Sequence, residues 1–327
     1  MAHRERPRPA AGRLAGLLAA APDGAVVEIP AGSYREPLSI ARPVVLVAAD
    51  GPGSVTIELE RPCNVRADTE LRGLTFAGAG LLAAGSVRLA LWDCVVRDAA
   101  STGIGLRENA RLSASDSVIK DTGGNGLYIG GQAAARLSGC SLGPTDYSAI
   151  HLAHQADLEL EGCTVSSSRE HGVRATDASS LRIDGGAVRA SGLSGISAET
   201  SGRVILTGCA VCETERAGIL IGAGARARIE RCRIEDTGGS GLVVWIGATA
   251  QANGVVIARA GKNGLYLADG AHGVFEDCDI SATAFPAVHV GERADPVLRG
   301  LKIHDVEQDM AIAELALQAL RSAEGPV

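Results

Sequence analysis

The spacing of the cysteines constrains the fold more than any other feature of this sequence. Six of the eight cysteines are separated by multiples of 23 residues: Cys94, Cys140, Cys163, Cys209, Cys232 and Cys278. Two positions after each point of this series comes an aliphatic residue, and nine positions after it, from Gly103 to Ala287, comes glycine or alanine. The series continues without insertion to Leu301. A fixed period of this length indicates a solenoid, in which each repeat packs on its neighbours.

The pattern inside one repeat predicts strands. Short stretches alternate between apolar and polar residues, and turn sequences such as the DTGG of residues 121–124 and 236–239 separate them. Only 3% of the residues are aromatic, which suits a narrow interior filled by small aliphatic side chains and cysteines. Parallel crossover connections are right-handed in nearly all proteins. We therefore predict an all-β fold, a right-handed parallel β-helix of about ten coils.

The two ends of a solenoid need covers, because the terminal coils expose unpaired backbone and apolar interior. Residues 12–21 are predicted to form a short helix that caps the first coil. Residues 307–323 have the pattern of an amphipathic helix that caps the last coil, folds back along the side or pairs with a partner, with capping favoured. The predicted organisation is a flexible segment over 1–11, one β-helix domain with its cap over 12–306, and a helix and tail over 307–327.

Charge and composition limit the partners. A formal net charge of −7 argues against a nucleic-acid partner. No stretch is apolar enough over about 20 residues to span a bilayer, so no membrane partner is expected. The N-terminus lacks the sustained apolar segment of a secretory signal, which favours the cytoplasm and reduced thiols. The cysteines are then interpreted as small buried hydrophobes, including Cys209 of the Cys209–Cys212 pair, which has CxxC spacing.

Residues 21–58, APDGAVVEIPAGSYREPLSIARPVVLVAADGPGSVTIE, together with the repeats that follow, resemble bacterial pectin-lyase-like β-helix proteins. That family contains polysaccharide lyases, hydrolases, uronate epimerases and non-catalytic scaffolds, so the resemblance implies the fold and a link to carbohydrates but no single activity. The sequence departs from the family's enzymes. The DPHD cluster of alginate epimerases is missing, with Asp146-Tyr147 the nearest fragment. The paired aspartates of polygalacturonases and the calcium-binding face of pectate lyases are not found either.

One outward row of the predicted sheet carries candidate catalytic residues. Eleven residues after successive points of the series stand Tyr128, His151 and Arg174. Neighbours in such a row lie about 4.8 Å apart. A phenol, an imidazole and a guanidinium placed side by side supply a proton donor, a base and a clamp for an anionic oxygen. An ordinary polar surface is the competing interpretation of these three residues.

The same face is predicted to contact a ligand further along. The row continues to Leu220, Val243 and Tyr266, and the row two residues on contains Arg107, Thr176, Glu199 and Trp245. An exposed apolar patch usually binds something. The candidates are an elongated ligand less polar than a uronic-acid polymer, a second copy of the chain that forms a homodimer, or the C-terminal helix of the chain itself.

Other polar groups are interpreted as structural. His151 and His154 have HxxH spacing, with Glu170, His171 and Asp177 one coil on, but His154 and His171 fall at different corners, so no metal site is expected. No cofactor is expected. Arg136, Glu159 and Arg182 recur every 23 residues and are predicted to form a charge ladder that contributes little to stability.

Two functions remain open from the sequence. The first is a metal-independent acid–base enzyme of the lyase, isomerase or cyclase type, acting on an elongated, partly apolar or carbohydrate-like ligand. His151 is then the base, Tyr128 the acid and Arg174 the oxygen clamp. The second is a non-catalytic scaffold whose flat face binds a glycan or a protein. The sequence favours the enzyme slightly, because the three polar residues and the apolar patch share one face.

Overall fold

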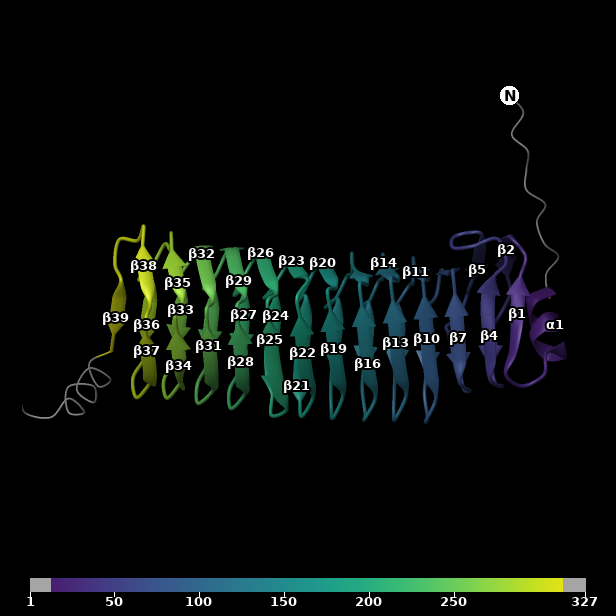
Figure 1. The fold of residues 1–327 in the computed structure, drawn as a ribbon, viewed down its shortest axis with the longest axis horizontal. Helices are drawn as coiled ribbons and strands as arrows, with labels where there is room; N and C mark the ends of the chain where they lie inside the picture. The colour runs from purple at the N-terminus through teal and green to yellow at the C-terminus, as the bar shows by residue number, and fades with distance from the viewer. Residues whose placement is uncertain (1–12, 314–327) are drawn as a thin grey trace, which may run out of the picture.

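The computed structural model describes residues 13–313, which form one short helix and three parallel sheets, A, B and C, of 13 strands each (Figure 1). Successive strands along the chain belong to sheets A, B and C in turn, so that every strand pairs with the strands three places before and after it. The predicted parallel β-helix is confirmed. The number of coils is 13, not ten.

The strands of sheet A are β1 Ala25–Ile29, β4 Val44–Ala48, β7 Thr69–Arg72, β10 Arg88–Trp92, β13 Arg111–Ser115, β16 Ala134–Ser138, β19 Asp157–Glu161, β22 Ser180–Asp184, β25 Arg203–Thr207, β28 Arg226–Glu230, β31 Thr249–Asn253, β34 His272–Glu276 and β37 Asp295–Arg299. Those of sheet B are β2 Gly32–Arg35, β5 Val55–Glu58, β8 Leu74–Ala77, β11 Val95–Arg97, β14 Val118–Lys120, β17 Ser141–Leu142, β20 Thr164–Ser168, β23 Ala187–Ser191, β26 Ala210–Thr214, β29 Arg233–Thr237, β32 Val256–Ala260, β35 Asp279–Ser281 and β38 Lys302–His304. Those of sheet C are β3 Ser39–Ile40, β6 Cys63–Val65, β9 Leu81–Ala83, β12 Ile104–Leu106, β15 Leu127–Ile129, β18 Ile150–Leu152, β21 Val173–Asp177, β24 Ile196–Thr200, β27 Ile219–Ile221, β30 Leu242–Val244, β33 Leu265–Leu267, β36 Val288–Val290 and β39 Met310–Ile312.

The coils that the 23-residue period did not predict lie mostly at the N-terminal end. Ala25 pairs with Val44, Val44 with Thr69, and Thr69 with Leu89, so the separation along the chain changes from coil to coil. From Arg88, which pairs with Arg111, the separation settles at the period seen in the sequence. The early coils therefore have the same stacked strands but turns of unequal length, and a fixed period cannot detect them.

At the corners between a sheet A strand and the following sheet B strand, the chain has a residue in the left-handed backbone conformation. Asp116 has φ 49°, Gly139 has φ 60° and Arg231 has φ 50°, and each stands directly before a position of the cysteine series. Only glycine adopts this conformation without a steric penalty, and aspartate tolerates it better than most residues. These corner residues explain why Gly and Asp recur beside the cysteines.

Glycine recurs nine residues after most points of the cysteine series because the chain there passes close to the next coil. A special backbone angle is not the reason. A Cβ atom on Gly218 would lie 2.3 Å from Cγ2 of Ile234, an interior residue of the next coil, and 2.9 Å from the carbonyl oxygen of Gly241. The turn before each sheet C strand therefore presses on the core of the following coil. A larger side chain at this position requires the packing to shift.

The interior is one continuous column of aliphatic and cysteine side chains. All six cysteines of the repeat are buried, and Cys209 and Cys232 on neighbouring coils bring their sulfur atoms to 3.4 Å. Cys212 points outward from sheet B, in register with Arg189, and is half-buried. The prediction that the repeat cysteines act as small core hydrophobes is confirmed.

The N-terminal cap forms as predicted, as α1 Arg13–Ala20 (Figure 1). Leu14 is fully buried against the first coils. The backbone N–H groups of Leu14 and Ala15 donate to the two carboxylate oxygens of Glu36, each at 2.9 Å, which satisfies donors that a helix start leaves free.

The helix predicted from residue 307 is wrong over its first turn. Met310–Ile312 is strand β39, and Met310 pairs with Val288 of β36. Backbone pairing with the open edge of sheet C outweighs the helical pattern of the side chains here. The remainder of the predicted helix, residues 314–323, lies outside the described residues, as does the predicted flexible segment before residue 12.

The interior position of the cysteines predicts their reactivity. Burial raises the pKa of the Cys63 thiol to about 12 and that of Cys94 to about 11, so neither is a thiolate near neutral pH. In native protein, titration with a chromogenic disulfide reagent should modify Cys212 alone, because its thiol is the accessible one, and faster as the pH rises, because partial burial also raises the pKa of this thiol. All eight thiols should react after denaturation. Rapid modification of native Cys212→Ser protein would contradict this packing.

Candidate functional site

Sheet C carries the row of residues that the repeat predicts. Tyr128 pairs with His151, His151 with Arg174, and Arg174 with Ser197. Tyr128, His151 and Arg174 each lie between two buried residues of their strand. The side chains of Tyr128, His151 and Arg174 are all half-buried. The sheet therefore fixes these three side chains side by side on consecutive coils.

The three side chains are neighbours in the row, but no hydrogen bond joins one to another. The rings of Tyr128 and His151 meet edge to face, with centroids 5.6 Å apart and planes at 85°. On the other side of His151, Nε of Arg174 is buried and has no hydrogen-bond partner in the described part of the chain. An unpaired buried donor costs free energy. Because protein covers Nε in this conformation, a ligand oxygen reaches it only when the Arg174 side chain turns outward.

Burial and the neighbouring cation hold His151 in its neutral form. The pKa of His151 is lowered from its ordinary value, mainly because burial disfavours the imidazolium and also because Arg174 is positively charged. Glu170 and Asp177 oppose this shift. A neutral imidazole accepts a proton, so His151 can act as a base near neutral pH.

His171 is a functional candidate that the sequence analysis considered only as a metal ligand. It stands in the turn before β21, and its Nδ1 is buried without a hydrogen-bond partner among the described residues. Its pKa is also lowered, first by burial and then by Arg174. Arg174 therefore acts electrostatically on two imidazoles. The repeat offers no signal for this, because turn residues do not follow the inward–outward alternation of strands.

A hollow of about 260 Å³ lies beside Tyr128 at the N-terminal end of the row. It exists because Gly105, the neighbour of Tyr128 in the row, has no side chain. The predicted binding residue Arg107 lines it, together with Glu60 and Leu82 from the irregular early coils. The Tyr128 ring lies along its own strand, since a Cβ atom on Gly130 would be 2.8 Å from its hydroxyl oxygen.

The second predicted row is only partly available to a ligand. The Thr176 hydroxyl donates to the carbonyl oxygen of Leu152 at 3.0 Å, so its proton is already used. Glu199 is exposed and accepts a hydrogen bond from the Ser197 hydroxyl at 3.0 Å. Trp245 is 44% exposed and is the most accessible part of the predicted patch.

The apolar end of the face is an aromatic stack. Tyr266 and His289 lie parallel, with ring centroids 4.7 Å apart and planes at 5°, and Trp245 stacks on Tyr266 at 6.3 Å and 28°. Leu220 is half-buried and Val243 is buried. The rings of Tyr266 and His289 stack face to face, so a ligand that lies along the sheet contacts the edges of these rings. The homodimer expected through this face or the C-terminal helix stays a prediction.

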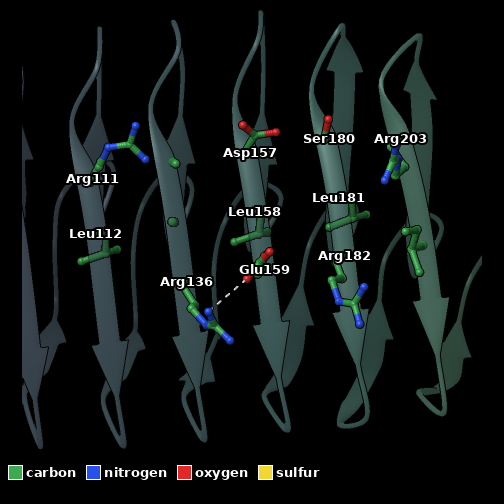
Figure 2. A pocket seen from close by; sticks show the side chains of 13 residues that line it. Arg111, Leu112, Arg136, Asp157, Leu158, Glu159, Ser180, Leu181, Arg182 and Arg203 are labelled. Atoms are coloured by element: carbon green, nitrogen blue, oxygen red, sulfur yellow. Dashed lines mark ion pairs between the residues drawn. The ribbon is translucent and has the colours of Figure 1, made fainter.

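A groove with a volume of about 760 Å³ lies on sheet A (Figure 2). The predicted charge ladder forms part of it, since Arg136, Glu159 and Arg182 pair in register. Arg136 forms an ion pair with Glu159 at 3.6 Å, whereas Arg182 turns to Asp184 at 3.4 Å. The sequence interpretation missed the groove because it followed only one outward row of this sheet.

The described residues contain no group of three or more His, Cys, Asp or Glu side chains arranged to hold a metal ion. His154 follows β18 and His171 precedes β21, at opposite ends of the sheet C strands. Within the described range, no helix is long and apolar enough to cross a bilayer.

Comparison with known proteins supports the fold. Residues 125–257 match the family model for the right handed beta helix region. No curated protein matches the sequence. Among solved structures, the catalytic unit of the GH87 alpha-1,3-glucanase from Streptomyces thermodiastaticus strain HF3-3 is 15% identical over 94% of this chain and 68% of its own, with a TM-score of 0.68. The periplasmic alginate epimerase AlgG is 12% identical over 89% and 82%, with a TM-score of 0.63. The A-module of the mannuronan C-5 epimerase AlgE6 from Azotobacter vinelandii is 12% identical over 89% and 90%, with a TM-score of 0.61. At these identities the likeness shows the right-handed parallel β-helix alone.

The shared influence of Arg174 gives a testable electrostatic prediction. Replacement of Arg174 by Gln removes the positive charge that disfavours the imidazolium, so the pKa values of His151 and His171 should both rise. Histidine ring NMR titration measures both. The matched control is Arg189→Gln on sheet B, which should leave both pKa values unchanged. If the Arg174 variant titrates like the wild type, the guanidinium does not lie against these rings.

Proposed function

We propose that the protein is a metal-independent acid–base enzyme that acts on an elongated carbohydrate bound along the outer face of sheet C. The observation that carries the proposal is the position of His151. A half-buried imidazole with a lowered pKa lies between the edge of a phenol ring and a guanidinium whose Nε is unpaired. A solvated polar surface does not need an unpaired buried donor, whereas a site that awaits an oxyanion does.

The proposed chemistry begins with proton abstraction. Neutral His151 removes the proton from the carbon next to a carboxylate or carbonyl group of the substrate, and the electron pair moves onto the oxygen of that group. Arg174 donates to the oxygen as its charge increases, which stabilises the enolate. Nε has no partner in the free protein and takes part in this contact once the Arg174 side chain turns toward the ligand, so the interaction favours the charged state over the free protein.

Tyr128 completes the reaction as the acid. Both side chains project from the same face of the sheet and their rings are in contact, so Tyr128 donates its phenolic proton on the side of the substrate from which His151 removes one. Donation to the oxygen that leaves the neighbouring carbon gives elimination, and donation to the same carbon gives proton exchange. In both cases the phenolate recovers a proton from solvent or, through the ligand site, from the imidazolium. The ring lies beside the hollow lined by Arg107 and Gly105, so the phenol has space in front of it for one sugar unit.

Several features support a carbohydrate rather than a strongly apolar ligand. The patch that was expected to be apolar and exposed is only partly exposed. Val243 is buried, and the ring faces of Tyr266 and His289 pack on each other. From His151 to Tyr266 the row runs over five strand spacings, roughly 24 Å, which suits an extended oligosaccharide. The structures similar in fold include two epimerases named for alginate and mannuronan and one alpha-1,3-glucanase.

A non-catalytic glycan-binding scaffold is the second candidate. It is favoured by the lack of any hydrogen bond, in the described structure, among Tyr128, His151 and Arg174. Such a scaffold binds through the same half-buried row but moves no proton. The two functions therefore differ in turnover and not in the location of the ligand.

Solvent deuterium separates the two candidates. Wild-type protein in D2O, incubated with oligogalacturonate, oligomannuronate and a neutral glucan, should exchange the carbon-bound proton of one substrate, or eliminate across it, as NMR detects. His151→Gln should reduce this rate by about 10²–10⁴-fold, because general base catalysis supplies an acceleration of that size. Tyr128→Phe should reduce product formation and leave binding within a small factor.

The matched control is His272→Gln, an exposed histidine on sheet A outside the row. It should leave the rate unchanged. Binding of a glycan to sheet C with no exchange and no new unsaturation would contradict the enzyme and support the scaffold.

A further inference from the structure

We propose that the arginine groove on sheet A is a second binding site, for a linear acidic glycan, separate from the site on sheet C. The groove is formed by two outward rows (Figure 2). The upper row in that view contains Arg111, Asp157, Ser180 and Arg203, and the lower row contains Arg136, Glu159 and Arg182. The proposal does not depend on the chemistry proposed for sheet C.

The groove has a length and a direction that suit a chain molecule. Arg111 pairs with Ala134, Ala134 with Asp157, and Asp157 with Ser180, and Arg203 stands on the following strand. From Arg111 to Arg203 there are four strand spacings, or about 19 Å along the helix axis. Small side chains at Ala134 and Ser180 keep the floor low between the charged residues.

The charges of the groove are positive in a chain that is negative overall. Four arginines face two carboxylates there, whereas the whole protein has a formal net charge of −7. Arg111 and Arg203 form no ion pair within the described residues, and both are exposed. Two guanidiniums are therefore available to anions without first breaking an internal pair, and each can bind a carboxylate through two parallel hydrogen bonds.

The mixture of groups favours an acidic glycan over a nucleic acid. Asp157, Glu159 and Ser180 can accept hydrogen bonds from sugar hydroxyl groups, and the two carboxylates repel a backbone with phosphate at every unit. No aromatic side chain lines the groove, so it offers no platform for stacked bases. Arg136 and Arg182 are two strands apart, roughly 10 Å, with Glu159 between them. This alternation suits a ligand in which acidic groups are spaced by hydroxyl-bearing positions.

The groove binds without catalysis on this account. It contains no histidine, tyrosine or cysteine, and its arginines do not act as bases because they stay protonated. An enzyme that acts at sheet C on a polymer gains residence time from a second site on another face, since a chain held at one site remains at a high local concentration near the other.

The test uses full-length protein in which the sheet C site is disabled by His151→Gln and Arg174→Ala. Calorimetric titration with a hyaluronan hexasaccharide, in which each uronate alternates with a neutral sugar, should still show binding, and the binding should weaken with added salt. Adding Arg111→Ala and Arg203→Ala should lower the affinity by at least roughly tenfold, because two charge-assisted contacts are lost. Ala134→Tyr should also lower it, by filling the groove without a change of charge.

The controls separate this proposal from its alternatives. Arg189→Ala on sheet B removes an exposed arginine outside the groove and should not change the affinity. Maltohexaose, which is neutral, should not bind. The proposal is overturned if the disabled protein does not bind the hyaluronan hexasaccharide, if the groove variants bind it as tightly as their parent, or if single-stranded oligothymidylate binds at the groove more tightly than the glycan. None of these results decides whether wild-type sheet C is catalytic.

Discussion

Every feature of this protein depends on the register of parallel pairing between successive coils. Each strand hydrogen-bonds to its copies on the coils before and after it, in three sheets of 13 strands. In-register pairing places residues that share a position in the repeat at one strand spacing, about 4.8 Å, along the axis. A shift by one residue would bring the cysteines out of the core and the row of His151 into it. Side-chain columns, inside and outside, are the direct consequence.

The regular coils were predictable because their constraints recur. The buried cysteines, the aliphatic residues behind them and the pairing of Tyr128 with His151 and of His151 with Arg174 all follow from one period. The early coils were not predictable in this way, since their turns differ in length while their strands still pair. At the C-terminal end, Met310 lies on an amphipathic pattern, yet its backbone completes the edge of sheet C. Backbone pairing decides such cases, and a side-chain pattern alone does not contain it.

The sequence predicts which residues of the candidate site share a row, but it does not predict the hollow beside them. Periodicity placed Tyr128, His151 and Arg174 together, and it identified Trp245 as an exposed aromatic residue. It did not reveal the hollow beside Tyr128, because Glu60 and Leu82 come from the irregular coils. It also gave no role to His171, whose position depends on a turn. The arginines at the two ends of the sheet A groove follow the same period, so the sequence contains the signal for them.

The charged residues make two regions of the surface suited to different tasks, proton transfer on sheet C and anion binding on sheet A. On sheet C, Arg174 is close enough to two half-buried imidazoles to lower the pKa of both, and its own Nε is unpaired, which makes the region suited to proton transfer beside a developing negative charge. On sheet A, the arginines are exposed and separated by carboxylates, which suits reversible binding of a sparse anion. One scaffold therefore presents a reactive face and a binding face on different sheets.

The central claim is that a carbohydrate lies along sheet C with its reacting carbon at His151. A crystal structure of the His151→Gln protein with a bound acidic oligosaccharide tests it most directly. The account predicts a sugar carboxylate or carbonyl oxygen on the guanidinium of Arg174, the adjacent carbon against residue 151, and one sugar unit in the hollow beside Tyr128. An oligosaccharide bound elsewhere on the protein, with Arg174 still unpaired and the hollow empty, would contradict it.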